Sequence, residues 1–241
     1  MNTITEASIL VVDDDRDIVN AIAKLLEKEG YTIYKAYNGL EAIDCLMQNE
    51  IHLILIDIMM PKMDGLSAMM KIRTTKNIPI IVLSAKSEDS DKILGLSMGA
   101  DDYITKPYNP MELAARVQSN LRRYLSLGAA DSTKIGSCIR IGGLTLDREA
   151  KQIYADGEPV KLTATEYKIT ELLMENAGRI FSAEEIYSRV WNEECYSVEN
   201  TVMVHIRHIR EKIEINPGEP RYLKVVWGIG YKIEKIGGIK P

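Results

Sequence analysis

The first half of the chain alternates short, almost wholly apolar segments with segments whose apolar residues recur at helical spacing, and this alternation constrains the fold most. Apolar runs without polar alternation are typical of strands buried on both faces, as in a parallel sheet. Five strand–helix units in succession therefore predict an α/β domain with a doubly wound parallel sheet. The predicted strands are 8–12, 31–37, 51–58, 78–84 and 103–104, and the predicted helices are 18–29, 40–48, 66–73, 91–98 and 109–125.

The pattern changes after residues 126–137, a stretch of small and polar residues that we predict to be a linker. Short strands with turns between them then precede three helices and a final hairpin. Thr163 and Ser182 each stand three residues before a glutamate, which is the spacing of a capping box at a helix start. We therefore predict two domains, 1–125 and 138–241, the second of α+β type. Its predicted strands are 139–141, 144–146, 152–155, 160–162, 222–226 and 231–236, and its third helix is 198–215.

Composition limits the classes of partner. The 30 basic and 35 acidic residues give a net charge of −5, which excludes a protein coated with positive charge. Residues 201–241 nevertheless hold 8 basic and 4 acidic residues, so any binding of nucleic acid is expected in this segment. No apolar run approaches the roughly 20 residues of a spanning helix. The three cysteines have no CxxC spacing, and the first residues lack a secretory signal, so we expect no membrane contact and a cytosolic location.

Polar side chains follow four of the predicted strands. Asp13 and Asp14 follow the first strand, Asp57 ends the third, Ser84 ends the fourth, and Lys106 follows the fifth. The carboxyl ends of parallel strands meet at one edge of a sheet, where ligands bind. Crowded carboxylates favour a cation such as Mg²⁺, and a carboxylate beside Mg²⁺ can act as a nucleophile toward phosphorus. This edge is therefore a candidate phosphoryl-transfer site.

The motifs at these strand ends resemble the receiver domain of two-component response regulators, which has a flavodoxin-like (βα)5 fold. Motifs of the second half resemble the winged-helix effector of the OmpR/PhoB family, and the resemblance covers nearly the whole chain. Residues 226–232 look most like the regulators of vancomycin-type resistance. The receiver motifs are 9–14, 56–61, 83–85 and 103–107, and the effector motifs are 162–167, 204–210 and 228–231.

Applied residue by residue, the resemblance implies that Asp57 accepts a phosphoryl group from a phosphohistidine of a sensor histidine kinase. Asp13, Asp14, Asp57 and the backbone carbonyl of Met59 are then expected to hold Mg²⁺. Phosphoryl transfer would switch the protein between states and would not serve turnover, so we expect no enzyme in the ordinary sense.

The resemblance also assigns the residues that respond. Lys106 would pair with the phosphoryl group, Ser84 would hydrogen-bond it, and Tyr103 would change rotamer. The Lys106–Pro107 bond is expected to be cis. Packing within the sheet is the alternative role for Tyr103.

The resemblance places a dimer interface on the fourth helix, fifth strand and fifth helix. Single surface ion pairs contribute only about 0–1 kcal/mol, so dimerisation would also need the apolar centre of this face. We expect phosphorylation to shift the population toward a symmetric dimer. The charged residues expected on this face are Lys92, Asp101, Asp102, Glu112, Arg116 and Arg123.

The third helix of the second half is amphipathic, and its apolar stripe is expected to be buried. The opposite face suits a major groove, where hydroxyl, methyl and cationic groups distinguish base edges. We expect Arg207 and Arg210 to contact phosphates or the groove. The stripe is Val202, Ile206, Ile209 and Ile213, and the residues expected nearest the bases are Asn200, Thr201, Val204 and His208.

The terminal hairpin departs from the commonest pattern of the resembled family, because Trp227 stands where that family has an arginine. Trp227 could contact DNA sugars or pack against the recognition helix, and Lys224 and Lys232 could reach phosphates. Residues 191–197 resemble a loop that contacts RNA polymerase, although a solvated turn is the alternative. The whole chain is thus expected to bind tandem promoter half-sites as a dimer.

Other interpretations stay open at this stage. Asp13, Asp14 and Asp15 could form only an acidic helix cap. A stand-alone phosphatase would use Asp13 and Asp15, but Asp17 stands where such enzymes have threonine or valine. His205 and His208 could be surface or hinge residues. A DNA-binding protein that ignores phosphorylation is the remaining alternative.

Overall fold

The computed structural model describes residues 7–85, 95–126, 138–192 and 199–235. The chain divides into two compact units, Met1–Leu125 and Ser126–Pro241, which are described separately. Residues 127–137 of the predicted linker and 91–94 of the predicted helix 91–98 lie outside the described residues; residues 95–97 of that helix are helical. Among the described helices, none has the length and apolar character to cross a membrane.

The first unit contains a five-stranded sheet in the order β2-β1-β3-β4-β5, and all four strand pairs are parallel. The central strands β3 and β4 are buried at every position, as their apolar sequences predict. The doubly wound flavodoxin-like fold is thus confirmed. The strands are β1 (Ser8–Val12), β2 (Thr32–Ala36), β3 (Leu53–Asp57), β4 (Ile80–Ser84) and β5 (Asp102–Thr105).

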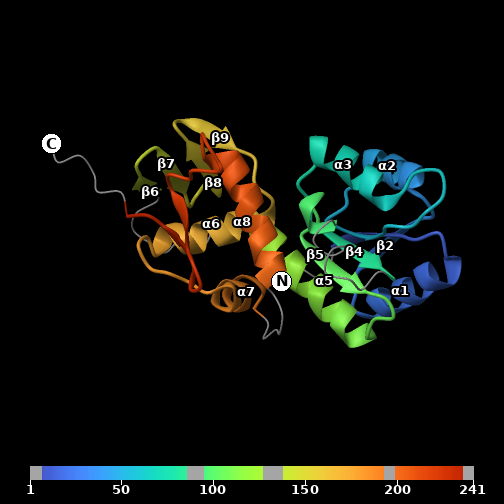
Figure 1. Cartoon of the computed structure of the whole chain (residues 1–241). Coiled ribbons are helices and arrows are strands. Elements are labelled where there is room, and N and C mark those ends of the chain that lie inside the picture. Colours follow the sequence, from blue (N-terminus) through green and yellow to red (C-terminus); the bar gives the residue numbers. More distant parts are fainter. Residues whose placement is uncertain (1–6, 86–94, 127–137, 193–198, 236–241) are drawn as a thin grey trace. The chain divides into compact units, whose positions relative to one another are not determined.

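Helices cover both faces of this sheet, with α1 and α5 on one side and α2 and α3 on the other (Figure 1). All four begin at a side chain that accepts a hydrogen bond from a first-turn N–H group: Asp15, Asn38, Asp64 and Asn109. These caps determine where each loop after a strand ends. The helices are α1 (Arg16–Lys28), α2 (Gly39–Gln48), α3 (Gly65–Thr75) and α5 (Pro110–Ser126).

A buried ion pair joins α3 to the edge of the sheet. The Arg73 guanidinium donates to the Asp101 carboxylate at 2.6 Å and to the carbonyls of Gly99 at 2.8 Å and Ile78 at 2.6 Å. Asp101 is fully buried and also accepts from the Ile80 N–H at 3.1 Å. One carboxylate and one guanidinium therefore hold the starts of β4 and β5 to the end of α3.

The second unit contains a four-stranded antiparallel sheet, three helices and a two-stranded antiparallel hairpin (Figure 1). Strand β9 lies two residues earlier than predicted, because Val160 pairs with Ile153 and Leu162 leads directly into a helix cap. The elements are β6 (Cys138–Ile141), β7 (Leu144–Asp147), β8 (Gln152–Ala155), β9 (Glu158–Val160), α6 (Ala164–Glu175), α7 (Ala183–Trp191), α8 (Glu199–Ile213), β10 (Leu223–Val226) and β11 (Gly230–Ile233).

Both predicted capping boxes are confirmed, at Thr163 for α6 and at Ser182 for α7. The core of the unit is formed around Trp191 and Phe181, which are fully buried. Phe181 and Tyr231 exchange two backbone hydrogen bonds of 2.9 Å, which pin the hairpin to the segment before α7. Gly230 permits this approach, since an added Cβ would stand 2.0 Å from the Phe181 carbonyl oxygen.

The Arg73–Asp101 pair gives a stability prediction. Arg73→Met is expected to lower the free energy of unfolding of the first unit by about 3 kcal/mol, because Asp101 stays buried without its counter-charge. Lys71→Met, on the exposed side of α3, is the matched control. Urea unfolding followed by far-UV circular dichroism measures the difference. Tryptophan fluorescence should not change, because both tryptophans lie in the second unit; equal midpoints for the two variants would contradict the prediction.

Candidate functional site

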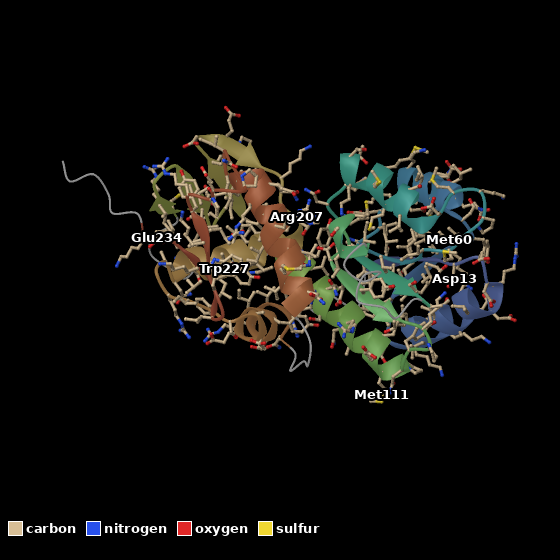
Figure 2. The ribbon with its side chains drawn as sticks, viewed as in Figure 1. Asp13, Met60, Met111, Arg207, Trp227 and Glu234 are labelled. Carbon is tan, nitrogen blue, oxygen red and sulfur yellow. The ribbon has the colours of Figure 1, made fainter. Side chains whose placement is uncertain are left out.

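Two buried carboxylates and one lysine meet at the carboxyl ends of the parallel strands. Asp57 is the last residue of β3 and Asp13 directly follows β1; they are 5% and 1% exposed. The Lys106 ammonium lies 2.6 Å from an Asp13 oxygen and 2.9 Å from an Asp57 oxygen. Figure 2 labels Asp13 and Met60 at the same end of the unit. The structure thus brings together the three charged groups that follow β1, β3 and β5.

The backbone around the two carboxylates holds each of them by its second oxygen. Asp13 accepts from the Asp15 N–H at 3.0 Å, and Asp57 accepts from the Met59 N–H at 2.8 Å. The start of α3 packs directly on the end of β3, and only glycine fits there, since a Cβ on Gly65 would stand 2.0 Å from the Asp57 carbonyl oxygen. Each carboxylate therefore has a fixed orientation, which is a requirement for in-line chemistry.

The loop after β5 places Lys106. Its N–H donates to the Ser84 carbonyl at 2.7 Å, and the Lys106–Pro107 peptide is cis as expected. Ser84 is fully buried at the end of β4, next to β3. The Tyr103 ring lies on β5 against Gly95, where an added Cβ would be 3.2 Å away. Ser84 and Tyr103 thus lie on the two strands that follow β3 in the sheet; their switch roles stay predictions.

Burial and mutual charge determine the protonation of this site. Burial raises the pKa of Asp57, and the charge of Asp13 raises it further, while Lys106 and the Met59 N–H act in the opposite direction. Burial lowers the pKa of Lys106, but the hydrogen bonds to Asp13 and Asp57 outweigh it, so its pKa lies above the ordinary value. Lys106 therefore stays charged, and ionisation of Asp57 lowers the stability of the folded protein.

Whether these residues suit a divalent cation follows from their donors. Among the described residues, no three His, Cys, Asp or Glu side chains are arranged to hold a metal ion. Asp13 and Asp57 nevertheless supply adjacent hard oxygen donors, and Asp14 and Met59 line an open hollow beside them. Two carboxylates with one backbone carbonyl and water is a donor set that suits Mg²⁺. The Asp14 side chain is exposed, whereas the ion-paired carboxylates are buried.

The expected dimer face requires correction. Asp101 and Asp102 are 0% and 3% exposed, so neither carboxylate is available to a partner. Asp101 pairs with Arg73, and Asp102 accepts from the Arg116 guanidinium at 3.0 Å. Arg123 is also buried and bonds Ser119 and Asn120 of its own helix. Glu112 remains on the surface, whereas Lys92 lies outside the described residues.

Helix α8 confirms the predicted buried stripe. All four stripe residues, from Val202 to Ile213, are buried in the apolar core of the unit. Val204 does not belong to that core, and its contact with a base stays a prediction. Asn200 and Thr201 are partly exposed, and the Arg207 side chain is 72% exposed, with an ion pair to Glu211.

Arg210, His208 and Lys212 of α8 face other residues of the same unit. The Arg210 guanidinium donates to the Leu223 carbonyl of β10 at 2.9 Å, and burial lowers its pKa. His208 is 15% exposed and lies 3.8 Å from the carboxylate of Glu166, to which Lys212 donates at 2.6 Å. Arg210 thus joins α8 to the hairpin, and Lys212 joins it to α6.

A groove lies between the hairpin, the start of α7 and α8. Met203 of α8 and Ile229 of the hairpin line it and are 44% and 60% exposed, and the sequence analysis missed both. The position of Ile229 between two glycines was the available signal. Trp227 is 87% exposed, which excludes packing on the recognition helix as its role. Trp191 is fully buried, and 193–197 of the predicted polymerase-contacting loop lie outside the described residues.

A five-stranded parallel domain with two carboxylates and a lysine at its strand ends, followed by a domain of three helices and a wing, defines the class of two-component response regulators. The response regulator receiver domain matches residues 9–118, and the transcriptional regulatory protein C-terminal domain matches residues 157–233. The first match contains Asp13, Asp57 and Lys106, and the second contains α6 to β11.

Curated relatives extend the likeness over the whole chain, which belongs to the OmpR/PhoB family of response regulators. Regulatory protein VanR of Enterococcus faecium is 42% identical over 228 residues, covering 94% of this chain and 98% of the relative. The transcriptional regulatory protein YcbL of Bacillus subtilis is 42% identical over 224 residues, covering 93% and 99%. A solved structure of a RitR mutant is 25% identical, with a TM-score of 0.74 and coverage of 95% and 99%.

The raised pKa of Asp57 predicts a pH-dependent gain in stability on its neutralisation. The folded protein binds the Asp57 proton more tightly than the unfolded chain, so ionisation above the pKa costs stability. Asp57→Asn should raise the melting temperature at about pH 7 in chelator, and the gain should shrink toward about pH 4. Thermal melts followed by circular dichroism measure both.

Asp64 is the matched control of opposite sign. The N–H and hydroxyl of Ser67 lower its pKa, so its ionised form stabilises the fold above the ordinary carboxyl pKa, and that stability is lost as pH falls through the lowered value. Asp64→Asn is expected to lower the melting temperature slightly at about pH 7. A lower melting temperature for Asp57→Asn would contradict the assignment of Asp57 as the costly charge.

Proposed function

We propose that this response regulator is a phosphorylation-dependent transcription factor whose receiver, 1–125, accepts a phosphoryl group on Asp57. The effector, 138–241, binds promoter DNA after that step. The observation that carries the proposal is the Lys106 ammonium between Asp13 and Asp57, because it presents a charged, oriented carboxylate beside a cation at the edge of a receiver sheet. A sensor histidine kinase would supply the phosphoryl group.

The proposed transfer uses Asp57 as nucleophile. A carboxylate oxygen of Asp57 forms a bond to phosphorus as the bond from phosphorus to the histidine nitrogen breaks, and the kinase imidazole leaves with the electron pair. Lys106 releases the Asp57 oxygen and neutralises the charge of the phosphoryl oxygens. The Met59 N–H keeps the second carboxylate oxygen in place during attack. The product is an acyl phosphate, and no turnover of substrate is needed.

We propose that Asp13, Asp14, Asp57 and the Met59 carbonyl hold Mg²⁺, which would neutralise charge on the transferred group. Asp13 keeps its orientation through the Asp15 N–H, which leaves its other oxygen to face Asp57 and Lys106. Ser84, buried beside β3, would then hydrogen-bond the phosphoryl group, and Tyr103, whose ring lies against Gly95, would change rotamer. These roles follow from membership of the family.

For the effector we propose DNA contacts on the exposed side of α8 and on the hairpin. Arg207 would exchange its exposed pair with Glu211 for a phosphate, because such pairs contribute little. Asn200, Thr201 and the edge of His208 would lie nearest the bases, and Lys224 and Trp227 would contact the backbone. A dimer on tandem half-sites would present its bound form to RNA polymerase.

The phosphoryl-transfer claim has a direct test. Acetyl phosphate with Mg²⁺ should add one phosphoryl group to the parent chain and none to Asp57→Asn, as measured by intact-mass spectrometry, because the Asp57 carboxylate is the proposed nucleophile. Asp64→Asn should react as the parent does. Affinity for a duplex selected from a random-sequence DNA pool should rise roughly tenfold on phosphorylation of the parent. Equal DNA affinity of the two forms would support the phosphorylation-independent alternative, and steady phosphate release from small esters would support a phosphatase.

Dimerisation is expected to use an exposed residue of α5, since Asp101, Asp102, Arg116 and Arg123 bond within the unit. Met111, beside Glu112, is 81% exposed. Beryllofluoride, a phosphoryl mimic, should raise the sedimentation coefficient of the parent, and Met111→Glu should abolish the rise because a charge would enter an apolar contact. Met47→Glu changes an equally exposed methionine of α2 and should leave the rise intact. An unchanged coefficient for the parent would contradict dimerisation.

A further inference from the structure

The tip of the hairpin between β10 and β11 is apolar and exposed. Trp227 is 87% exposed and Ile229 is 60% exposed, and only Gly228 separates them. Two large apolar side chains this exposed at one turn form a small apolar patch. Exposure of this patch to water is unfavourable, so its burial against a partner would be favourable. The groove between this tip and α8 is further lined by Met203 and Asn200. Figure 2 shows Trp227 on the hairpin and Arg207 on α8 of the same unit.

The base of the hairpin is fixed to the end of α8 by two side chains one helical turn apart. The buried Glu214 carboxylate accepts from the N–H groups of Arg221, Tyr222 and Leu223 at 2.7–2.8 Å. Arg210 donates to the Leu223 carbonyl at 2.9 Å. These bonds hold the start of β10 in a fixed position against the end of α8. The apolar tip therefore has a fixed position relative to the exposed side of the recognition helix.

The charges beside the tip favour an anionic occupant. Lys224 and Lys232 are direct cross-strand partners, an arrangement of like charges that disfavours the isolated hairpin. Lys224 bonds the Pro220 carbonyl and Lys232 pairs with Glu234, so both ammonium groups are held on the hairpin. Glu184 at the far side of the groove is held ionised by the Ser182 hydroxyl and disfavours a phosphate there. The two lysines on the strands of the hairpin and the apolar side chains at its tip match a DNA strand, whose phosphates alternate with apolar sugar faces.

We infer that Trp227 and Ile229 form an apolar wing tip that contacts the deoxyribose faces of duplex DNA, so that the wing contributes to binding without adding a cation. The inference deepens the proposed DNA-binding function and rests on it. Removal of an apolar contact releases no counterion, so it lowers affinity without changing the dependence of affinity on salt. A cationic wing residue would change that dependence.

The test measures the affinity of the full-length chain for a duplex selected from a random-sequence DNA pool, over a range of salt concentrations. Trp227→Ala should lower affinity roughly tenfold or more with an unchanged salt slope, because an aromatic contact is lost. Trp227→Phe should retain most of the affinity. Trp227→Arg should steepen the slope by about 0.9, the effect of one added phosphate contact. Ile215→Ala is the matched control, since Ile215 is 91% exposed in the same unit, and it should bind as the parent does.

Intrinsic fluorescence gives a second readout on the same proteins. Trp191 is fully buried and Trp227 is 87% exposed, so acrylamide quenching that is present in the parent and absent in Trp227→Phe reports the wing tip. Bound duplex should suppress this quenching several-fold. Melting temperatures should be equal for the parent and Trp227→Ala, because an exposed side chain supports no packing.

Each contrary result has a distinct meaning. Parent affinity in Trp227→Ala, a shallower salt slope for that variant, or quenching that persists on the duplex would overturn the apolar wing tip while DNA binding stands. A sedimentation coefficient that falls in Trp227→Ala without DNA would also overturn it, because the tip would then be covered by a second copy of the chain. A parent chain that enriches no duplex from the pool would contradict the proposed function itself, and the wing-tip inference would fall with it.

Discussion

The Lys106 ammonium between the carboxylates of Asp13 and Asp57 is the interaction on which the receiver depends. Its three residues lie at the carboxyl ends of β1, β3 and β5, which a parallel sheet brings to one edge. Two carboxylates in a buried position repel each other, and the lysine makes their proximity tolerable. The caps at Asp15 and Asp64 and the close contact at Gly65 set the loops from which these groups project.

The ion pairs among Asp13, Asp57 and Lys106 would change if a new anion were added to this site. Asp57 is a buried carboxylate with a raised pKa, and the Lys106 ammonium lies 2.9 Å from one of its oxygens. A phosphoryl group on Asp57 would add negative charge between Lys106 and the end of β4, where Ser84 is buried. In contrast, the Arg73–Asp101 pair at the opposite ends of β4 and β5 is held by hydrogen bonds to the backbone of Ile78, Ile80 and Gly99 and gives the sheet a rigid reference. A structural change caused at Asp57 would therefore be confined mainly to the carboxyl ends of the strands.

Sequence reasoning found the receiver site because its signal is local: polar residues stand where buried strands end. It placed Asp13, Asp57 and Lys106 together without knowing any contact. It failed where burial depends on distant partners. Asp101 reads as a surface charge until Arg73, far along the chain, is seen to neutralise it.

Affinity for a phosphoryl mimic tests the coupling between the two units most directly. Calorimetric titration of the full chain with beryllofluoride and Mg²⁺, with and without a bound duplex from the random-sequence pool, measures how far DNA binding changes the receiver. Linkage requires that the duplex raise beryllofluoride affinity by the same factor by which beryllofluoride raises duplex affinity, expected to be roughly tenfold. Equal beryllofluoride affinities with and without duplex would contradict the account, because the site at Asp57 and the DNA-binding surface would then act independently.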